Sequence, residues 1–466
     1  MSDTGAGRRI LAVLGHSLHV RNFVASGCLG ELAAHGHTLT VVMPRDLITE
    51  VRRFDAAAPL SLEPIEPHVP RGFVASARTL ARMASFVQRE HLKTYRHKVR
   101  LAVAASLKYR LSVPVFRALR RRRDLEVLVR RLEGWRAPGA ASLALIDRVR
   151  PHLVFCPTLI HDGSDFDLLK AARIRGVPIA AFAATWDTLT SKGCFVVPPD
   201  ALLVWGEESR RHAIEFHALA AGRVVATGAP HLDVYGEGWP VEPRERFLAA
   251  RGIDPAKRVV LFAGTTISYW QDEPGQLRAL SAAIAGGELK DCVIWYRPHP
   301  RRSGRDVAAL GDLPGVYVDD QVLRQKREGV SSYSTRPDDL PHYRNLVEAC
   351  EVVVAAFSTM ILEAALLGKP SLVVGFDLDP RAPARLFKHA EYEHSLELLA
   401  TPGVTLCRSL DDLKRGILRA CSGEGVPLAP ALRAHAGRIA NNLDGGGRQR
   451  IANTLQALAG ASTAWS

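Results

Sequence analysis

The chain has 466 residues, of which 47% are hydrophobic and 23% charged, a composition typical of a folded globular protein and unlike a disordered or collagen-like one. This length exceeds what one hydrophobic core organises comfortably, so we expect two α/β domains. The formal net charge of +13 favours anionic partners such as nucleotide phosphates or an anionic membrane surface, whereas no RNA- or DNA-binding motif is present, which argues against nucleic acid.

The chain contains no candidate for export or for crossing a membrane. No apolar run approaches the roughly 20 residues that a spanning helix needs, and residues 10–14 are too short for the apolar part of a secretory signal. The seven cysteines are widely spaced without a CxxC pair, which argues against both a disulfide framework and a zinc site. We therefore expect a cytoplasmic protein with reduced thiols.

The first 43 residues have the pattern of a βαβ unit. Residues 10–14 predict a strand, a glycine-containing loop follows, and residues 23–34 and 38–43 predict a helix and a second strand. Strands that alternate with helices form a parallel sheet, and such sheets bind ligands outside the carboxyl ends of their strands. The loop at Gly15 and His16 is therefore expected at the working edge of the sheet.

Residues from about 73 to 135 predict a basic helical insert in the first domain. Apolar residues recur at helical spacing, and arginines cluster around them. The apolar side chains can pack on the first domain with the arginines in solvent, or the insert can dock on the inner, anionic face of a membrane. Both readings apply to Val115, Phe116, Leu119, Leu125, Val127 and Leu128.

Further strand and helix patterns continue to the end of the chain. A glycine- and proline-rich stretch, GEGWPVEPRE, separates two series of such patterns and predicts a linker. We predict an α/β protein of two Rossmann-like domains facing a cleft. The first comprises residues 1–235 and the second residues 236–430, and residues 431–466 form C-terminal helices, the last of which crosses back to the first domain.

Two motifs of the second domain follow predicted strands and can bind an anion. In RPHP, residues 297–300, the Arg297 guanidinium and the His299 imidazole can hold a diphosphate or a nucleobase edge, and Arg301 and Arg302 extend the basic character. The alternative is a solvated basic turn.

The second of these motifs contains Ser358 and Thr359, which stand where a strand ends and a helix begins. Hydroxyl and backbone N–H groups at the positive end of a helix dipole form a phosphate cradle, although either residue can simply cap the helix. Glu363, about one turn further on, can accept hydrogen bonds from ribose hydroxyls or be an exposed helix carboxylate.

The first domain offers candidates for a general base that activates an acceptor hydroxyl. His16 follows the first strand, with His19 beside it, and the pKa of histidine lies near the working pH. Asp162 and Asp165 follow a later strand, and burial can raise the pKa of such a carboxyl group into a useful range. Capping or structural roles are the alternatives for these residues, and we rank His16 and Asp162 together.

The loop TWDTLTSKG, residues 185–193, combines aromatic, acidic, hydroxyl and basic groups. Such a mixture is costly to bury without partners, so Trp186, Asp187 and Lys192 are expected either at an acceptor or cleft contact or in an ordinary solvated loop. A DxD pair at Asp165 and Asp167 runs into a predicted helix, where its carboxylates would diverge, so we expect no metal and no cofactor.

Together, TWDTLTSKG, VVATGAPHLDVY, RPHP and DDLPHYRNLVEACEVVVAAFSTMILEAALLGKP resemble bacterial surface-polysaccharide glycosyltransferases of GT-B architecture, related to the CDP-glycerol glycerophosphotransferase family. His299-Pro300 and Ser358-Thr359 also resemble the HP and Ser-Ser/Thr motifs with which sialyl and Kdo transferases bind a cytidine nucleotide. The sialyltransferase acid-acid-glycine motif differs here, because His161 precedes Asp162 and Gly163.

The resemblance implies a metal-independent transferase. It would move a sugar or polyol phosphate from a nucleotide-activated donor to a glycan or lipid-linked acceptor. Two alternatives remain open. VVATGAPHLDVY and the turn at Gly368-Lys369-Pro370 also resemble UDP-N-acetylglucosamine 2-epimerases. A non-catalytic peripheral membrane protein that uses only the basic insert is the third reading.

Overall fold

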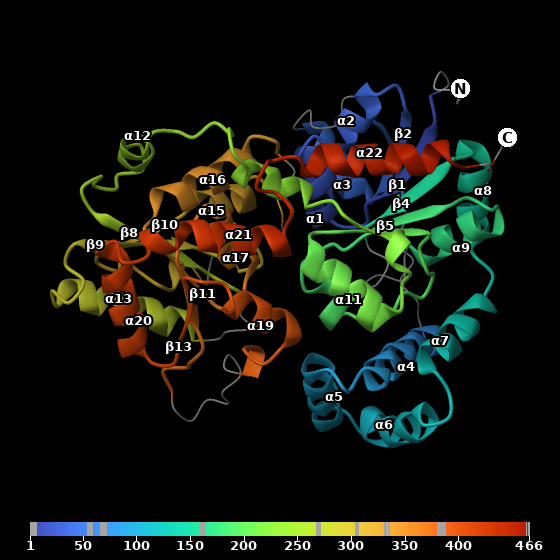
Figure 1. Ribbon diagram of the computed structural model, residues 1–466, viewed down its shortest axis with the longest axis horizontal. Coiled ribbons are helices and arrows are strands. Elements are labelled where there is room, and N and C mark those ends of the chain that lie inside the picture. The colour runs from blue at the N-terminus through green and yellow to red at the C-terminus, as the bar shows by residue number, and fades with distance from the viewer. Residues whose placement is uncertain are drawn as a thin grey trace. The chain divides into compact units, whose positions relative to one another are not determined.

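The computed structural model gives the fold of most of the chain (Figure 1). It describes residues 7–53, 59–65, 72–157, 165–266, 272–302, 307–329, 333, 336–379, 388–462 and 464. Over these residues the chain forms two compact units, each an α/β domain with one parallel sheet, as the sequence predicts. The first unit contains the residues up to Pro230 and those from Gly446 onward, together with residues 336 and 337, and the second contains the rest.

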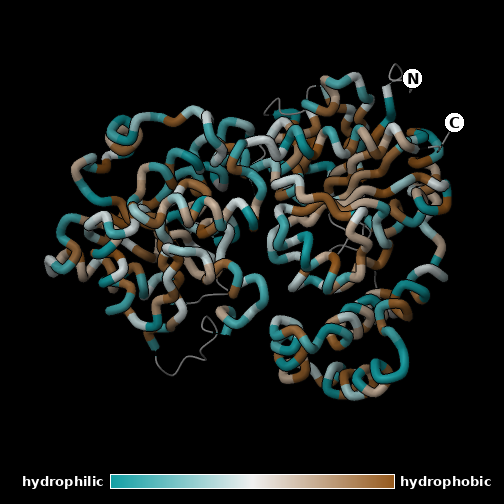
Figure 2. Tube along the Cα trace, in the orientation of Figure 1, coloured by the Kyte–Doolittle hydropathy of each residue, from teal (hydrophilic) through white to brown (hydrophobic). Residues whose placement is uncertain are grey.

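The first domain is built on a seven-stranded parallel sheet with the order β3-β2-β1-β4-β5-β6-β7. Its strands carry mostly hydrophobic residues (Figure 2), and the central ones are buried along their whole length, as expected for a parallel sheet covered on both faces. The order reverses between β1 and β4, where doubly wound sheets place their ligands. The strands are β1 (Arg9–Val13), β2 (Thr38–Met43), β3 (Ser61–Pro64), β4 (Leu153–Cys156), β5 (Ile179–Phe182), β6 (Ala201–Val204) and β7 (Val224–Ala226).

The helix predicted over residues 23–34 is interrupted. A π-helical turn at Arg21–Ala25 follows the short α1 (Ser17–Val20), and α2 (Cys28–Ala34) begins only after Gly27, whose φ of 81° is left-handed and breaks the helical path. The C-terminal helix α22 (Gly447–Gly460) packs along α2, and Arg448 Nη1 donates to the Ser26 carbonyl at 3.0 Å. The other helices of this sheet are α3 (Arg45–Arg53), α8 (Ala140–Val149), α9 (Phe166–Ile174), α10 (Thr188–Ser191) and α11 (Glu207–His217).

The predicted insert consists of four helices, α4 (Gly72–Gln88), α5 (Lys93–Ala105), α6 (Leu107–Arg120) and α7 (Leu125–Gly134). They enclose a small apolar core of their own. The buried Arg89 joins this core to the sheet domain: it forms an ion pair with Glu126 at 2.8 Å and donates to the Gly193 carbonyl at 2.6 Å and to His217 Nδ1 at 3.1 Å. A buried arginine with three partners holds the insert against the loop that follows β5.

The second domain repeats the strand arrangement of the first. Its six-stranded parallel sheet has the order β10-β9-β8-β11-β12-β13, so its order reverses between β8 and β11. The strands are β8 (Arg258–Ala263), β9 (Cys292–Arg297), β10 (Val316–Val318), β11 (Val352–Ala355), β12 (Ser371–Val374) and β13 (Val404–Cys407). Its helices are α12 (Arg244–Ala249), α13 (Glu273–Ala285), α15 (Asp320–Arg327), α16 (Asp339–Ala349), α17 (Thr359–Leu366), α19 (Glu393–Leu399), α20 (Leu410–Cys421) and α21 (Ala429–Ile439).

Short 3₁₀ turns at Ala221–Arg223, Pro230–Tyr235 and Val426–Leu428 complete the described elements. Within the described part of the chain, no helix is both long and apolar enough to cross a membrane.

Candidate functional site

In the second domain, three loops at the carboxyl ends of neighbouring strands form the candidate site. Residues 264–266 follow β8, residues 297–300 span the end of β9 and the turn after it, and residues 357–359 follow β11. Since β8 lies between β9 and β11 in the sheet, the three loops share one edge at the point where the strand order reverses. The sequence predicts two of these loops, and the third is found only in the structure.

Ser358 caps α17, as one of the two readings of its motif predicts. Its backbone is extended, and its Oγ accepts a hydrogen bond from the Met360 amide at 3.3 Å. The hydroxyl proton is not used by this cap, so it can still be donated to a phosphate oxygen at the positive end of the helix. Ser358 and Thr359 are both partly exposed, which is compatible with a ligand contact.

Glu363 is a buried carboxylate, so the reading as an exposed helix residue is wrong. Its Oε2 accepts a hydrogen bond from the hydroxyl of Tyr235, which ends the 3₁₀ turn Pro230–Tyr235. Burial, followed by the Glu363 carboxylate, raises the pKa of Tyr235 well above its usual value, so the phenol keeps its proton and remains a donor. Ribose binding by Glu363 stays a prediction.

Arg297 is buried and bound within its own domain. Its Nη1 pairs with Asp319, its Nη2 donates to Gln321 Oε1 at 2.7 Å, and its guanidinium lies 4.1 Å from the centre of the Tyr343 ring. Burial alone would raise the pKa of Asp319, but Arg297 and His342 hold that pKa well below its usual range. We expected the terminal nitrogens of Arg297 to bind the nucleotide-activated donor. They bind Asp319 and Gln321 instead, which favours a structural role for Arg297.

His299 is oriented by the turn that follows it. Its Nδ1 accepts a hydrogen bond from the Arg301 amide at 3.0 Å, so the neutral ring carries its proton on Nε2. The ring is partly exposed and can present this N–H group to an oxygen atom of a ligand. The Arg302 side chain does not extend the basic surface as predicted, because it is buried in an ion pair with Glu273 at 2.9 Å.

Glu273, in the first turn of α13, organises the loop after β8. It is fully buried and accepts hydrogen bonds from the Thr265 amide at 2.7 Å and the Tyr296 hydroxyl at 2.6 Å. Burial raises the pKa of Glu273, and Arg302 opposes that shift. A Cβ atom at Gly264 would lie 2.8 Å from Glu273 Oε1, so glycine permits this close approach. The glycine directly after the strand at 258–263 is the sequence signal that could have indicated this loop.

In the first domain, His16 caps α1. Its Nδ1 accepts a hydrogen bond from the Leu18 amide at 3.1 Å, which leaves the proton of the neutral ring on Nε2. In this tautomer the Nδ1 lone pair accepts the bond from Leu18 and Nε2 carries the proton, so neither nitrogen can act as a base while the cap is intact. His19 is buried, with its ring 6.0 Å from that of His16. The geometry therefore favours the capping reading of His16 over the role of general base.

The acidic candidates lie after β4. Asp162 is outside the described residues. Asp165 is buried at the start of α9, and its Oδ1 would lie 3.4 Å from a Cβ atom at Gly15, so the carboxylate faces the loop after β1 across the point where the strand order reverses. Among the described candidates for the base, Asp165 is therefore the carboxylate at the predicted working edge of this sheet.

The TWDTLTSKG segment is not an ordinary solvated loop. It contains α10, Trp186 is buried, and Asp187 accepts hydrogen bonds from Thr185 Oγ1 at 2.6 Å and Ser191 Oγ at 2.8 Å. Its mixed polar groups are thus largely satisfied within the segment, as their burial requires. The Lys192 side chain is partly exposed.

Lys98, on α5, is a residue that the sequence did not single out. Its Nζ donates to the Ser191 carbonyl, at the end of α10. Burial, assisted by Lys192 and opposed by Asp187, lowers the pKa of Lys98 to about 7. A lysine whose pKa is lowered toward neutral pH, in contact with the segment that follows β5, is a candidate for proton transfer or anion binding. The sequence could not reveal it, because the contact joins residues 93 positions apart.

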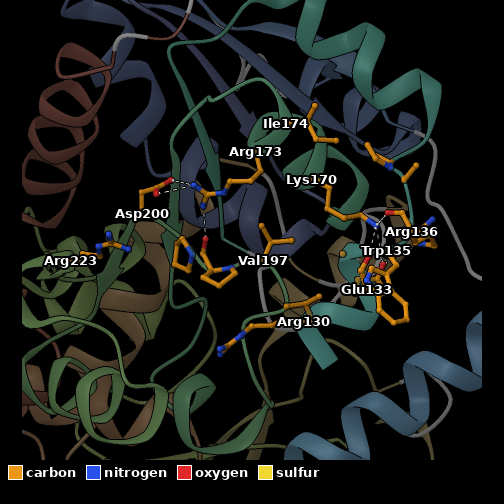
Figure 3. A pocket seen from close by; sticks show the side chains of 16 residues that line it. Arg130, Glu133, Trp135, Arg136, Lys170, Arg173, Ile174, Val197, Asp200 and Arg223 are labelled. Atoms are coloured by element: carbon orange, nitrogen blue, oxygen red, sulfur yellow. Dashed lines mark hydrogen bonds and ion pairs between the residues drawn. The ribbon is translucent and has the colours of Figure 1, made fainter. Parts of the chain in front are cut away.

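The structure also has an open cavity of about 750 Å³ elsewhere in the first domain (Figure 3). Its walls include Trp135, Ile174 and Val197, and an ion pair between Arg173 and Asp200 spans one side. The lining residues 196–200 precede β6 and Arg223 precedes β7, so this cavity lies at the amino-terminal edge of the sheet. It is therefore separate from the candidate site.

No group of three or more His, Cys, Asp or Glu residues suited to holding a metal ion occurs among the residues that the structure describes.

Two parallel-sheet Rossmann-like domains, each with its strand order reversing near the centre of the sheet, define the GT-B class of fold. Solved structures of that class match nearly the whole chain. UDP-GlcNAc 2-epimerase from Neisseria meningitidis, bound to UDP-GlcNAc, is 12% identical with a TM-score of 0.56, covering 96% of this chain and 100% of its own.

Glycosyltransferases match over the same extent. The calicheamicin glycosyltransferase CalG4 is 15% identical with a TM-score of 0.51, and a glycosyltransferase from Rickettsia africae is 10% identical with a TM-score of 0.52; each covers 98% of this chain and 100% of its own. No protein-family model and no curated protein sequence matches the chain. At these identities the likeness establishes the fold.

Proposed function

We propose that this protein is a glycosyltransferase that moves a sugar or polyol phosphate from a nucleotide-activated donor to a surface-glycan or lipid-linked acceptor, without a metal ion, in the cytoplasm. The observation that carries the proposal is the group of three strand-end loops in the second domain. They combine the capped N-terminus of α17, the partly exposed imidazole of His299, whose neutral form carries its proton on Nε2, and a glycine loop held by Glu273. Structures with the same fold include glycosyltransferases and an epimerase with UDP-GlcNAc bound.

In this proposal, the three loops bind the diphosphate of the donor and stabilise the negative charge that develops on it as it leaves. The start of α17 supplies the positive end of a helix dipole, and the Ser358 hydroxyl and His299 Nε2 supply donors. Such donors can take over the task of a divalent ion at a leaving phosphate. Arg297 supports the loop by its ion pair with Asp319.

The acceptor hydroxyl needs a base, which we expect among the strand-end residues of the first domain. Because His16 caps α1, we favour Asp165 and Asp162 over His16 as the base. A cytidine nucleotide as the donor, and a relationship to the CDP-glycerol, sialyl and Kdo transferases, rest on the His299-Pro300 and Ser358-Thr359 motifs. They belong to this proposal.

A nucleotide panel tests the donor. The unfolding temperature would be measured with CMP, CDP, UDP and GDP and with their activated sugars, because a ligand at about a hundred times its Kd adds roughly 2.7 kcal/mol of stability. We expect a cytidine nucleotide to raise the unfolding temperature most. If no nucleotide shifts it, the proposed donor site is wrong.

The second candidate function, a sugar-nucleotide epimerase, is favoured by the matching epimerase structures. An epimerase changes UDP-N-acetylglucosamine without any acceptor, whereas a transferase needs an acceptor for turnover beyond slow hydrolysis. Incubation with UDP-N-acetylglucosamine alone, followed by NMR of the sugar, separates the two. Formation of the 2-epimer would favour the epimerase.

A further inference from the structure

Helix α6 exposes an apolar face. Leu107, Leu111, Val115 and Leu119 follow one another at intervals of four residues, which places them along one side of the helix, and they are 68%, 68%, 55% and 39% exposed. The opposite side of α6 is the one that packs inward, through the buried Val113 and the partly buried Phe116. The helix belongs to the insert (Figure 1), and hydrophobic and hydrophilic residues alternate along the insert helices (Figure 2).

The exposure of these side chains bears on the two hypotheses for the insert, which are packing on the first domain and docking on a membrane. Of the six apolar residues that we considered, only Leu125 is buried and Phe116 partly so. Val115, Leu119, Val127 and Leu128 are each at least 39% exposed. Packing on the first domain therefore does not account for them, and exposing a row of large aliphatic side chains to water is unfavourable without a partner.

The charge around the apolar face has one sign. From Leu107 to Arg123 the sequence contains seven basic residues and no acidic one. Arg117 and Arg120 pair with Glu90, in the turn between α4 and α5, while Arg121, Arg122 and Arg123, just after α6, are exposed. The apolar row is thus bordered by cations that can reach a surface lying against it.

We propose that this face of α6, with Arg121, Arg122 and Arg123, docks on the surface of an anionic lipid bilayer. Leucine and valine side chains would enter the boundary between headgroups and acyl chains, while the arginines contact lipid phosphates. A second copy of the chain is a poor occupant, because two such faces would bring the exposed Arg121, Arg122 and Arg123 of each copy together, and the segment from Leu107 to Arg123 has no carboxylate to pair them. The inference does not depend on the proposed transfer reaction.

Co-sedimentation with vesicles tests the apolar part. The full chain would be mixed with vesicles of phosphatidylcholine alone and of phosphatidylcholine with phosphatidylglycerol, at low and at high salt. We expect binding to the anionic vesicles at low salt and at least a tenfold loss of affinity in the triple variant Leu107→Gln, Leu111→Gln, Val115→Gln.

The matched control changes exposed apolar residues of the second domain, Leu396→Gln, Leu418→Gln and Val426→Gln, which are 49%, 47% and 73% exposed. This control should bind as the parent does. If the α6 triple variant does not fold, as judged by circular dichroism, the single change Leu111→Asp takes its place. Equal losses in the α6 variant and the control would overturn the assignment to α6.

Changing Arg121, Arg122 and Arg123 to Ser tests the charged part. At about 1 kcal/mol per arginine near an anionic surface, the loss should be on the order of a hundredfold at low salt and much smaller at high salt. The control is Arg246→Ser, Arg415→Ser, Arg419→Ser, which removes the same charge from the exposed surface of the second domain.

Two results would overturn the docking proposal. One is the absence of binding to anionic vesicles at low salt. The other is a dimer in light scattering that the α6 variants abolish, without vesicle binding by the parent, which would make a second copy the occupant. Nucleotide binding is measured separately, so a failure of the proposed function leaves this test intact.

Discussion

The two domains share their strand order but fix their strand-end loops by different means. In the second domain, buried ion pairs from within the domain hold the loops: Arg297 with Asp319, and Arg302 with Glu273. In the first domain, His16 caps the helix after β1, and the helical insert contacts the loop after β5 through Lys98 and the buried Arg89. The buried ion pairs that hold these loops therefore belong to the sheet domain itself in the second domain, whereas in the first domain the buried pair of Arg89 with Glu126 belongs to the insert. The candidate loops of the second domain are thus held by contacts of their own domain, whereas the loop after β5 also depends on the insert.

Loss of the base should have the largest effect. Asp162→Asn or Asp165→Asn should lower the turnover number by about 10² to 10⁴, because a positioned general base typically contributes that much. His16→Ala should cost less, since its ring caps α1 through Nδ1. Steady-state kinetics and nucleotide binding would be measured together, and nucleotide affinity should stay nearly constant. If neither aspartate matters and His16 does, the division of roles in the first domain is wrong.

Loss of Glu273 should destabilise the second domain. Glu273→Ala leaves Arg302 buried without its carboxylate partner and removes an acceptor from Thr265 and Tyr296, so the free energy of unfolding should fall by about 3–5 kcal/mol. Glu288→Ala, which removes an exposed partner of Lys414, is the control and should cost about 1 kcal/mol or less. Urea unfolding measures both. Equal costs would mean that the loop after β8 is not held by this pair.

Substitutions at Ser358 and His299, the proposed nucleotide-binding residues, should have a smaller effect, and this effect should be confined to nucleotide affinity. Loss of the charge-assisted hydrogen bond from Ser358 or His299 should cost about 1.5–3 kcal/mol, or roughly ten- to a hundredfold in nucleotide affinity, in Ser358→Ala and His299→Ala. Isothermal titration with the nucleotide that the panel selects would measure the change. Arg415→Ala, an exposed arginine of the second domain outside these loops, is the control and should leave the affinity unchanged. Unchanged affinity in both variants would exclude these loops as the donor site.

The smallest effect concerns Lys98 and pH. Burial lowers the pKa of Lys98 to about 7 in the folded state, against about 10.5 when unfolded, so between these values the unfolded chain binds more protons. The contribution of Lys98 to stability should therefore be unfavourable and constant below pH 7, and should improve by at most about 1.4 kcal/mol per pH unit above it. In Lys98→Met this rise should disappear.

Unfolding by urea at pH 6, 7, 8 and 9 compares Lys98→Met with the parent and with Lys93→Met, an exposed lysine on the same helix. The Lys93 variant should follow the parent. Parallel stability curves for the parent and Lys98→Met would show that Lys98 keeps an ordinary pKa, and the contact between the insert and α10 would then lose its candidate role in proton transfer.

The sequence determined the class of fold, because buried parallel strands are continuous apolar runs that alternate with helical patterns. It missed β3 (Ser61–Pro64) and β13 (Val404–Cys407). Both are the outermost strands of their sheets and are partly exposed, so their apolar signal is weak. It also predicted an unbroken helix across Gly27, where a left-handed glycine divides it. The strand-end motifs at 297–300 and 358–359 were identified correctly as loops at one sheet edge, since that placement follows from the strand pattern alone.

The tertiary structure alone decided which groups in these motifs remain available. Arg297 finds Asp319 and Gln321 on the segment after the neighbouring strand, and Arg302 finds Glu273 on α13. Lys98 reaches Ser191 across 93 positions. The exposed apolar residues on α6 have the same helical spacing that buried residues would have. Only the packing of Val113 into the insert shows which face of the helix is exposed. Local patterns fix which side chains share a helix face or a strand end, but burial and ion pairing join residues that are distant in the chain, so they follow only from the packed fold.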